Sequence, residues 1–308
     1  MKAIRIHSFG GSDVLNLEDV PAPQPKMGEV LIKVQAAGVN PVDYKMRSGK
    51  YKADRLHPPL TLGREVSGVV EGVGADVTEI EVGDNVYAFL ASNSGGYAEY
   101  VVAQVNETAT KPATLEHIRA AGVPLAAITA WQGLFDHGKL RAGERVLIHG
   151  AAGGVGHFAV QFAKNRGAYV IATASGEDAD LLRKLGADEI INYHHERFED
   201  RVREVDLVFD LVAGDTQQRS WRVLKDGGRI ISTLQPPDRN EAVKRHALAR
   251  SFMAEPSRDQ LTEIARLIDA GKVSVVLDQT LPLAEARRAH DHLENDHIRG
   301  KVVLSVGG

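Results

Sequence analysis

A glycine-rich turn at residues 151–156 is the stretch of this sequence best suited to chemistry. It reads Ala-Ala-Gly-Gly-Val-Gly, an A-x-G-x-x-G pattern with alanine where the commoner form has its first glycine. Small residues let the backbone approach a pyrophosphate, and the N–H groups that open the next helix attract an anion. Because such turns also occur as plain tight connections, the motif has meaning only with its flanking elements.

The flanking elements predict a strand–turn–helix–strand unit. Residues 145–149 form a short apolar run, typical of a buried parallel strand. After the turn, apolar residues recur at the spacing of one helix face: Val155, Phe158, Ala159, Phe162 and Ala163. Gly167 ends this helix, and residues 169–173 are again strand-like. In this context we predict dinucleotide binding by Ala151, Gly153, Gly154, Val155 and Gly156.

The predicted secondary structure changes near residue 113, from short strands to helices and then to alternating strands and helices. Residues 1–110 carry short strand patterns separated by turn signals, which favours a β-rich fold. Helical patterns at 114–121 and 125–135 follow. Strands then alternate with helices, which predicts a doubly wound parallel sheet with strands at 145–149, 169–174, 189–193, 205–212, 228–234 and 247–253. A helix at 257–271, a strand at 273–277, a helix at 283–295 and a strand at 301–305 complete the prediction.

Composition narrows the class of protein. The chain has 308 residues, 43% of them hydrophobic and 25% charged, with a net charge of −4, as in an ordinary globular protein. Without a basic excess we expect no nucleic-acid partner. With no long apolar run and no signal-peptide pattern, we expect no membrane association and a cytoplasmic location. Cysteine is absent, so disulfides and cysteine-ligated zinc are excluded.

Several motifs together resemble one known family. They are AAGVNPVD at 36–43, RSGKY at 47–51, GREVSGVV at 63–70, HGAAGGVG at 149–156, KLGAD at 184–188 and GKVVL at 300–304. The chain resembles the zinc-independent, ζ-crystallin-like quinone oxidoreductases of the medium-chain dehydrogenase/reductase superfamily. This resemblance implies an α/β fold: a Rossmann domain with a six-stranded parallel sheet at 116–262, and a β-rich GroES-like catalytic domain at 1–115 and 263–308.

The resemblance also separates the chain from the zinc alcohol dehydrogenases. Those enzymes carry a cysteine where Asn40 stands and a zinc-binding histidine where Arg64 stands. A catalytic zinc needs about three protein ligands, so we expect no metal site. Without a Lewis acid, the family reduces acceptors that are already electrophilic, namely quinones and α,β-unsaturated carbonyls.

The same resemblance implies the catalytic residues. Asn40 is expected beside the nicotinamide and ribose, or else is only a turn residue before Pro41. Asp43 either takes part in function or only caps a helix. Lys45 stands where plant-type alkenal reductases also have lysine; it either donates a hydrogen bond to a developing enolate or is a solvated surface residue. Tyr51 either lines the acceptor pocket or packs on a turn.

The end of the second strand of the Rossmann unit bears on the cofactor. Ser175 leaves room for a 2′-phosphate and can donate to it, and Tyr193 matches a tyrosine of NADPH-dependent relatives. Glu177 and Asp178 oppose this, since carboxylates facing a phosphate would repel it. We therefore expect NADPH, with NADH as the less favoured alternative.

Further cofactor contacts are implied at Thr129, Val212, Leu234 and Phe252, although core packing explains each of them equally well. The domain order places the reaction at the carboxyl ends of the parallel strands. Pairing of the edge near 247–253 favours a homodimer or homotetramer. The competing hypothesis is a catalytically weak, NADPH-binding, ζ-crystallin-like protein with a structural or regulatory role.

Overall fold

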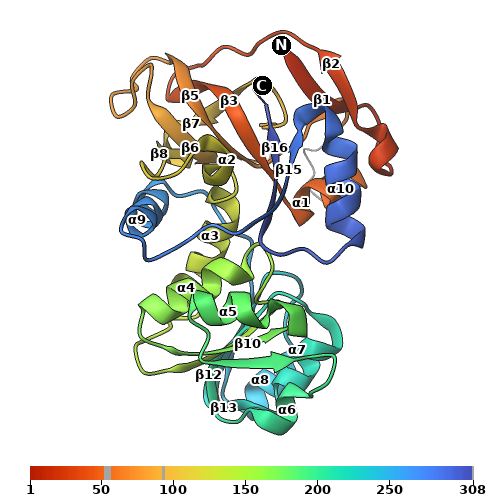
Figure 1. Cartoon of the computed structure of the whole chain (residues 1–308), viewed down its shortest axis with the longest axis vertical. Coiled ribbons are helices and arrows are strands. Elements are labelled where there is room, and N and C mark those ends of the chain that lie inside the picture. The colour runs from red at the N-terminus through yellow and green to blue at the C-terminus, as the bar shows by residue number, and fades with distance from the viewer. Residues whose placement is uncertain (52–56, 92–93, 307–308) are drawn as a thin grey trace. The chain divides into compact units, whose positions relative to one another are not determined.

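The computed structural model describes residues 1–51, 57–91 and 94–306. The chain forms two compact units (Figure 1). The β-rich unit comprises Met1–Leu125, Pro256–Gly271 and Val275–Gly308, and the nucleotide-binding unit comprises Ala126–Glu255 and Lys272–Ser274. The domain limits expected from the sequence, after residues 115 and 262, stay a prediction. The units divide elsewhere because two helices, His117–Ala120 (α2) and Arg258–Asp269 (α9), pack on strands of the β-rich unit.

A six-stranded parallel sheet forms the centre of the nucleotide-binding unit. Its order is β11-β10-β9-β12-β13-β14, so the chain starts in the middle and winds outward in both directions. This is the doubly wound order that the alternating pattern predicts. The strands are β9 (Arg145–His149), β10 (Tyr169–Ala174), β11 (Glu189–Asn192), β12 (Val205–Asp210), β13 (Leu224–Ser232) and β14 (Leu248–Ser251). All residues of β12 are buried, as expected for a strand covered on both faces.

Helices connect and cover these strands. They are α3 (Pro124–Trp131), a π-helix at Gln132–His137, α4 (Gly156–Asn165), α5 (Ala179–Leu185), α6 (Phe198–Arg201), α7 (Gly214–Ser220) and α8 (Arg239–Lys244). Figure 1 shows α4 and α5 next to each other, and α4 packs on β9 and β10. The predicted apolar face is buried at Phe158 and Phe162. The start of α4 is therefore held directly behind the glycine-rich turn.

The β-rich unit contains a seven-stranded sheet and a three-stranded sheet. The larger sheet is built on the long strand β3 (Glu29–Val39), which pairs with β5, β7 and β16. Its other members are β5 (Glu65–Val73), β6 (Asn85–Phe89), β7 (Tyr100–Gln104), β8 (Thr108–Thr110), β15 (Leu277–Pro282) and β16 (Lys301–Ser305). The smaller sheet contains β1 (Lys2–Ile6), β2 (Asn16–Asp19) and β4 (Leu60–Thr61), and the remaining helices are α1 (Pro41–Arg47) and α10 (Ala286–Asn295). The C-terminal strand β16 thus lies beside β3.

One expected strand is misplaced by the sequence pattern. The apolar residues Val273 and Val275 suggest a strand at 273–277, but they are buried in a loop. The strand begins only at Leu277, where β15 pairs in parallel with β16. Buried residues are apolar whether they lie in a loop or in a paired strand, so the sequence pattern does not distinguish the two. No helix in the described part of the chain combines the length and apolar character needed to cross a membrane.

Candidate active site

The glycine-rich turn has the geometry of an anion site. Within the described chain, the backbone N–H groups of Ala152, Gly154 and Val155 have no hydrogen-bond partner, and they directly precede α4. Gly156 must be glycine, since a Cβ there would come within 2.2 Å of the Gly150 carbonyl oxygen. Unpaired donors and small residues at the start of a helix fit a pyrophosphate. The turn therefore fits the phosphates of a dinucleotide.

Asp210 organises the neighbouring strand ends. This fully buried carboxylate accepts hydrogen bonds from the backbone N–H groups of Val212 (3.0 Å) and Ala213 (2.8 Å). It also accepts from the Ser232 hydroxyl at 2.9 Å, and Ser232 Oγ accepts from the backbone N–H of Leu234. Ala213 has φ +68°, an unfavourable backbone conformation that the bond to Asp210 holds in place. One carboxylate thus fixes the two loops that follow β12 and β13.

Three predicted cofactor residues are exposed apolar side chains after strand ends of the nucleotide-binding unit. Val212, Leu234 and Tyr193 are 49%, 45% and 51% exposed. Val212 lies beside the glycine turn, because a Cβ on Gly150 would be 3.4 Å from Val212 Cγ2. Exposed apolar groups next to a polar turn suit the rings of a dinucleotide. Their contacts with the cofactor remain predictions.

Ser175 has a partner that the sequence did not reveal. Its hydroxyl donates to the buried carboxylate of Asp178 at 2.6 Å. Since a hydroxyl has one proton, Ser175 in this arrangement can only accept from a ligand. Glu177, in contrast, is exposed. The expected donation from Ser175 to a 2′-phosphate therefore competes with Asp178.

Thr129 and Phe252 are placed within the nucleotide-binding unit by packing. Thr129 is buried in α3. Phe252 is half-buried against the π-helix, where its ring lies 4.5 Å from that of His137 and would contact a Cβ on Gly133 at 3.2 Å. These contacts agree with the core-packing interpretation and leave a cofactor contact as a prediction.

In the β-rich unit, Asn40 is held by a buried ion pair. Its Nδ2 donates to Glu65 Oε1 at 2.8 Å, and its Oδ1 accepts from Lys301 Nζ. Lys301 and Glu65 form the ion pair at 2.7 Å, and both are almost completely buried. The second oxygen of Glu65 accepts from the backbone N–H of Leu125. Asn40 therefore has a fixed orientation and is more than a turn residue before proline.

Asp43 fixes the backbone of Asn40 from the other side. Its Oδ2 accepts from the Asn40 backbone N–H at 2.8 Å and from the Tyr97 hydroxyl at 2.9 Å. Among the described residues, Oδ1 has no hydrogen-bond partner. Burial raises the pKa of Asp43 to about 6, against the hydrogen bonds from Asn40 and Tyr97, which lower it. Asp43 thus caps α1 and positions Asn40 at the same time.

A chain of hydrogen bonds continues from Asp43 to α10. Arg47, which can only donate, contacts His290 Nδ1 at 3.1 Å, and His290 Nε2 lies 3.4 Å from the Tyr97 hydroxyl. Burial and the Arg47 charge lower the pKa of His290 to about 3, so the ring is neutral with its proton on Nε2. In this series each hydrogen bond is therefore donated in the direction of Asp43, from Arg47 to His290, from His290 to Tyr97 and from Tyr97 to Asp43. Arg47 also forms an ion pair with Glu294 at 2.6 Å.

We expect Asp43→Asn to change how stability depends on pH. The raised pKa of Asp43 means that its contribution is present below pH 4 and is lost as pH rises through about 6. The variant lacks this loss, so its free energy of unfolding relative to wild type should rise by about 3 kcal/mol between pH 4 and pH 7. Denaturant unfolding at a series of pH values measures it. A difference that does not vary with pH would contradict the buried titration.

Lys45 and Tyr51 lie on and after α1. The Lys45 side chain is half-buried and has no hydrogen bond or ion pair to any described residue. Tyr51 packs on the apolar core, and its backbone N–H donates to the Lys45 carbonyl at 3.0 Å. Lys45 therefore has an ammonium group available to a ligand, and a place for Tyr51 in the acceptor pocket remains a prediction.

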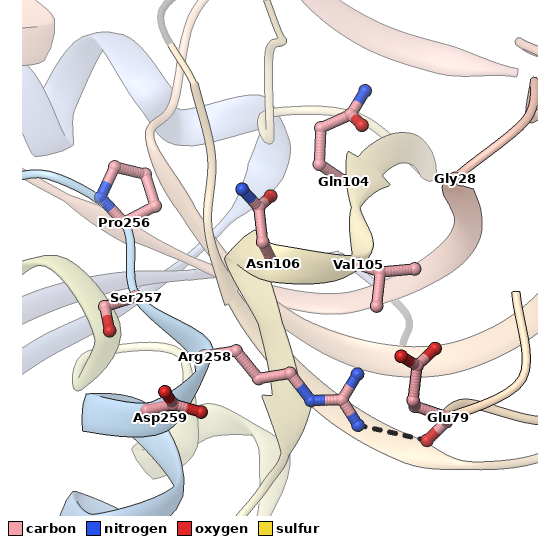
Figure 2. Close-up of a pocket in the computed structure, with 9 residues that line it drawn as sticks. All are labelled: Gly28, Glu79, Gln104, Val105, Asn106, Pro256, Ser257, Arg258 and Asp259. Atoms are coloured by element: carbon pink, nitrogen blue, oxygen red, sulfur yellow. Dashed lines mark hydrogen bonds between the residues drawn. The ribbon is translucent and has the colours of Figure 1, made fainter.

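Over residues 1–51, 57–91 and 94–306, no group of three or more histidine, aspartate or glutamate side chains is arranged to hold a metal ion. A separate open pocket of about 760 Å³ lies within the β-rich unit, beside the start of α9 (Figure 2). Arg258 spans part of it and donates to the Glu79 carbonyl oxygen at 3.1 Å. It contains none of the predicted site residues.

Comparisons with known proteins decide the family. Residues 26–113 match the alcohol dehydrogenase GroES-like domain, and residues 185–304 match a family described as zinc-binding dehydrogenase. The chain is 39% identical to the mitochondrial NAD(P)H oxidoreductase RTN4IP1 of Mus musculus, over 90% of this chain and 82% of that protein. It is 36% identical to the chloroplastic NADPH-dependent alkenal/one oxidoreductase of Arabidopsis thaliana, over 99% and 79%. The quinone oxidoreductase structure from Coxiella burnetii superimposes with a TM-score of 0.92 at 37% identity, covering 100% of this chain and 99% of that one.

The chain belongs to the medium-chain dehydrogenase/reductase superfamily. Within it, the protein is quinone oxidoreductase-like, and its GroES-like and Rossmann parts confirm the fold expected from the sequence.

Several residues that hold the candidate side chains in the two units were not predicted from the sequence. Glu65 and Lys301 lie inside motifs that carry the resemblance, yet nothing in the sequence pairs Asn40 with a lysine 261 residues away. Asp210 is the last residue of a buried parallel strand, a position where site residues are common. The roles of Tyr97 and His290 depend on contacts between distant elements, so no local pattern indicates them.

Proposed function

We propose that this protein is an NADPH-dependent reductase that transfers hydride to quinones or α,β-unsaturated carbonyls without zinc. The observation that carries the proposal is the glycine-rich turn, whose unpaired N–H groups precede α4 at the end of β9. The names of the Arabidopsis and Coxiella proteins support alkenal and quinone acceptors, respectively.

The residues of the chain would bind and orient rather than supply a reactive group. When bound, NADPH supplies the hydride. The glycine turn would hold its pyrophosphate, and Asn40 would orient the nicotinamide end from its fixed position. As a quinone or enone accepts hydride, negative charge is delocalised onto its carbonyl oxygen, and a hydrogen-bond donor to that oxygen stabilises the charge. Lys45 is our candidate for this donor.

We also propose an assembly and a location. Strand β14 forms one edge of the six-stranded sheet, and exposed apolar residues lie on it and after it, at Leu248 and Met253. Pairing of two such edges would give a homodimer or, with a second interface, a homotetramer. The mouse relative is named as mitochondrial, whereas the cytoplasmic location expected for this chain rests on its sequence alone.

The proposal is tested with metal-stripped protein. We expect faster oxidation of NADPH than of NADH, with either an ortho-quinone or a short-chain enone as acceptor, and the preferred acceptor identifies the substrate class. Tight NADPH binding without turnover on any acceptor would favour the structural or regulatory alternative. Turnover that returns only with added zinc would overturn the metal-free mechanism.

Lys45→Ala should lower kcat on an enone by about tenfold or more, because a donor to the developing enolate is lost. The measurement is steady-state kinetics with saturating NADPH. Lys50→Ala is the matched control, since Lys50 is an exposed lysine just after the same helix. Equal activities of the two variants would show that Lys45 is only a surface residue.

A further inference from the structure

The ends of β10 and β11 place one side-chain amide next to Gly176. The two strands are parallel neighbours, with Ala174 opposite Asn192. The amide oxygen of Asn192 accepts from the backbone N–H of His194 at 3.0 Å, which fixes the orientation of the amide. Its Nδ2 then faces the segment that follows β10. A Cβ on Gly176 would lie 2.6 Å from this nitrogen, so the amide fits there only because residue 176 is glycine.

The Asn192 Nδ2 group has no hydrogen-bond partner among the described residues. Asn192 is half-exposed, and both Gly176 and Tyr193 are exposed. The amide therefore presents N–H donors beside an open surface. Ser175, one residue before Gly176, has its only proton committed to Asp178. Between these two side chains, Asn192 therefore has a donor available to a ligand and Ser175 does not.

The residues that flank Ser175 and Asn192 in the sequence determine the charge that a 2′-phosphate would meet at this amide. Glu177 and Asp178 follow Ser175, while His194 and His195 follow Tyr193. The segments 175–178 and 192–195 contain no lysine or arginine. A phosphate here depends on neutral donors, because the carboxylates repel it. A neutral amide that donates to a charged oxygen forms one of the stronger hydrogen bonds in proteins.

We propose that Asn192, rather than Ser175, donates hydrogen bonds to the 2′-phosphate of the cofactor and so determines the preference for NADPH over NADH. The inference rests on the proposed function in taking NADPH as the cofactor. It assigns a specificity-determining role to a residue that lies between two strand ends and outside the glycine-rich turn.

Asn192→Asp tests the assignment with little change of shape. The aspartate keeps the oxygen that accepts from the His194 N–H, but it replaces the donors with a charge that repels phosphate. Calorimetric titration should show NADP⁺ binding weakened by about tenfold or more, the loss typical of a hydrogen bond to a charged group. NAD⁺ binding should change by less than about threefold. The ratio of kcat/KM for NADPH and NADH should follow the binding ratio.

Two further variants make the result specific. Asn240→Asp places the same charge change at an exposed position in α8 of the same unit, and it should leave both dissociation constants at their wild-type values. Ser175→Ala separates the two assignments. A fall in the NADP⁺ preference with Ser175→Ala but not with Asn192→Asp would overturn the proposal, as would an equal loss for both dinucleotides. The binding constants decide the inference even if no acceptor is reduced, so its failure is distinct from failure of the proposed function.

Discussion

Replacing Lys301 by methionine is expected to lower the free energy of unfolding by about 3–5 kcal/mol, because it leaves the buried Glu65 carboxylate without its cation. Asn40 Oδ1 loses its donor in the same variant, so only the hydrogen bond to Glu65 still orients its side chain. A small displacement of an orienting group costs much of the rate. We therefore expect kcat to fall by about tenfold or more. Denaturant unfolding and NADPH oxidation measure the two effects.

The double variant Glu65→Gln/Lys301→Met separates stability from function. Removing both charges avoids an unpaired buried ion, so stability should return to within about 2 kcal/mol of wild type. Asn40 Oδ1 no longer accepts from the Lys301 ammonium, so the wild-type orientation of Asn40 is not restored and activity should stay low. Full activity in the double variant would show that the ion pair only stabilises the β-rich unit and does not position Asn40.

Gly156→Ala is expected to weaken NADPH binding strongly. A Cβ at this position would lie 2.2 Å from the Gly150 carbonyl oxygen and 2.7 Å from backbone atoms of Ala151. These are backbone atoms that cannot move aside, so the turn itself must shift and its free N–H groups lose their arrangement. We expect the dissociation constant for NADPH to rise by about a hundredfold or more, with a stability loss of about 1–3 kcal/mol. Fluorescence titration of NADPH and thermal unfolding measure these effects.

Gly153→Ala is the matched control in the same turn. The nearest atom to a Cβ on Gly153 is the Gly150 carbonyl oxygen at 3.4 Å, and its backbone does not need glycine. This variant should fold with the stability of wild type. If the pyrophosphate lies against the turn, its affinity for NADPH should still fall, because the methyl group occupies the path of the phosphate. Unchanged affinity in both variants would move the phosphate site away from this turn.

Local pattern was enough to predict the Rossmann half of the fold. Buried parallel strands are apolar along their whole length, and glycine is required where a turn must lie close to its own strand, as at Gly156. These signals extend over a few residues, so they are visible in the sequence. The same local reasoning misplaced the strand near 273–277, because Val273 and Val275 are buried without joining a sheet.

The orientation of the candidate side chains depended on the tertiary structure. The sequence by itself determined that Asn40 precedes Pro41 and that Ser175 follows a predicted strand. Only the folded chain showed that Lys301 and Glu65 hold Asn40, and that Asp178 accepts the hydrogen bond that Ser175 donates. The physical reason is that a hydrogen bond depends on distance and direction in space. Lys301 reaches Asn40 because the C-terminal strand β16 pairs with β3, and no local pattern records that pairing.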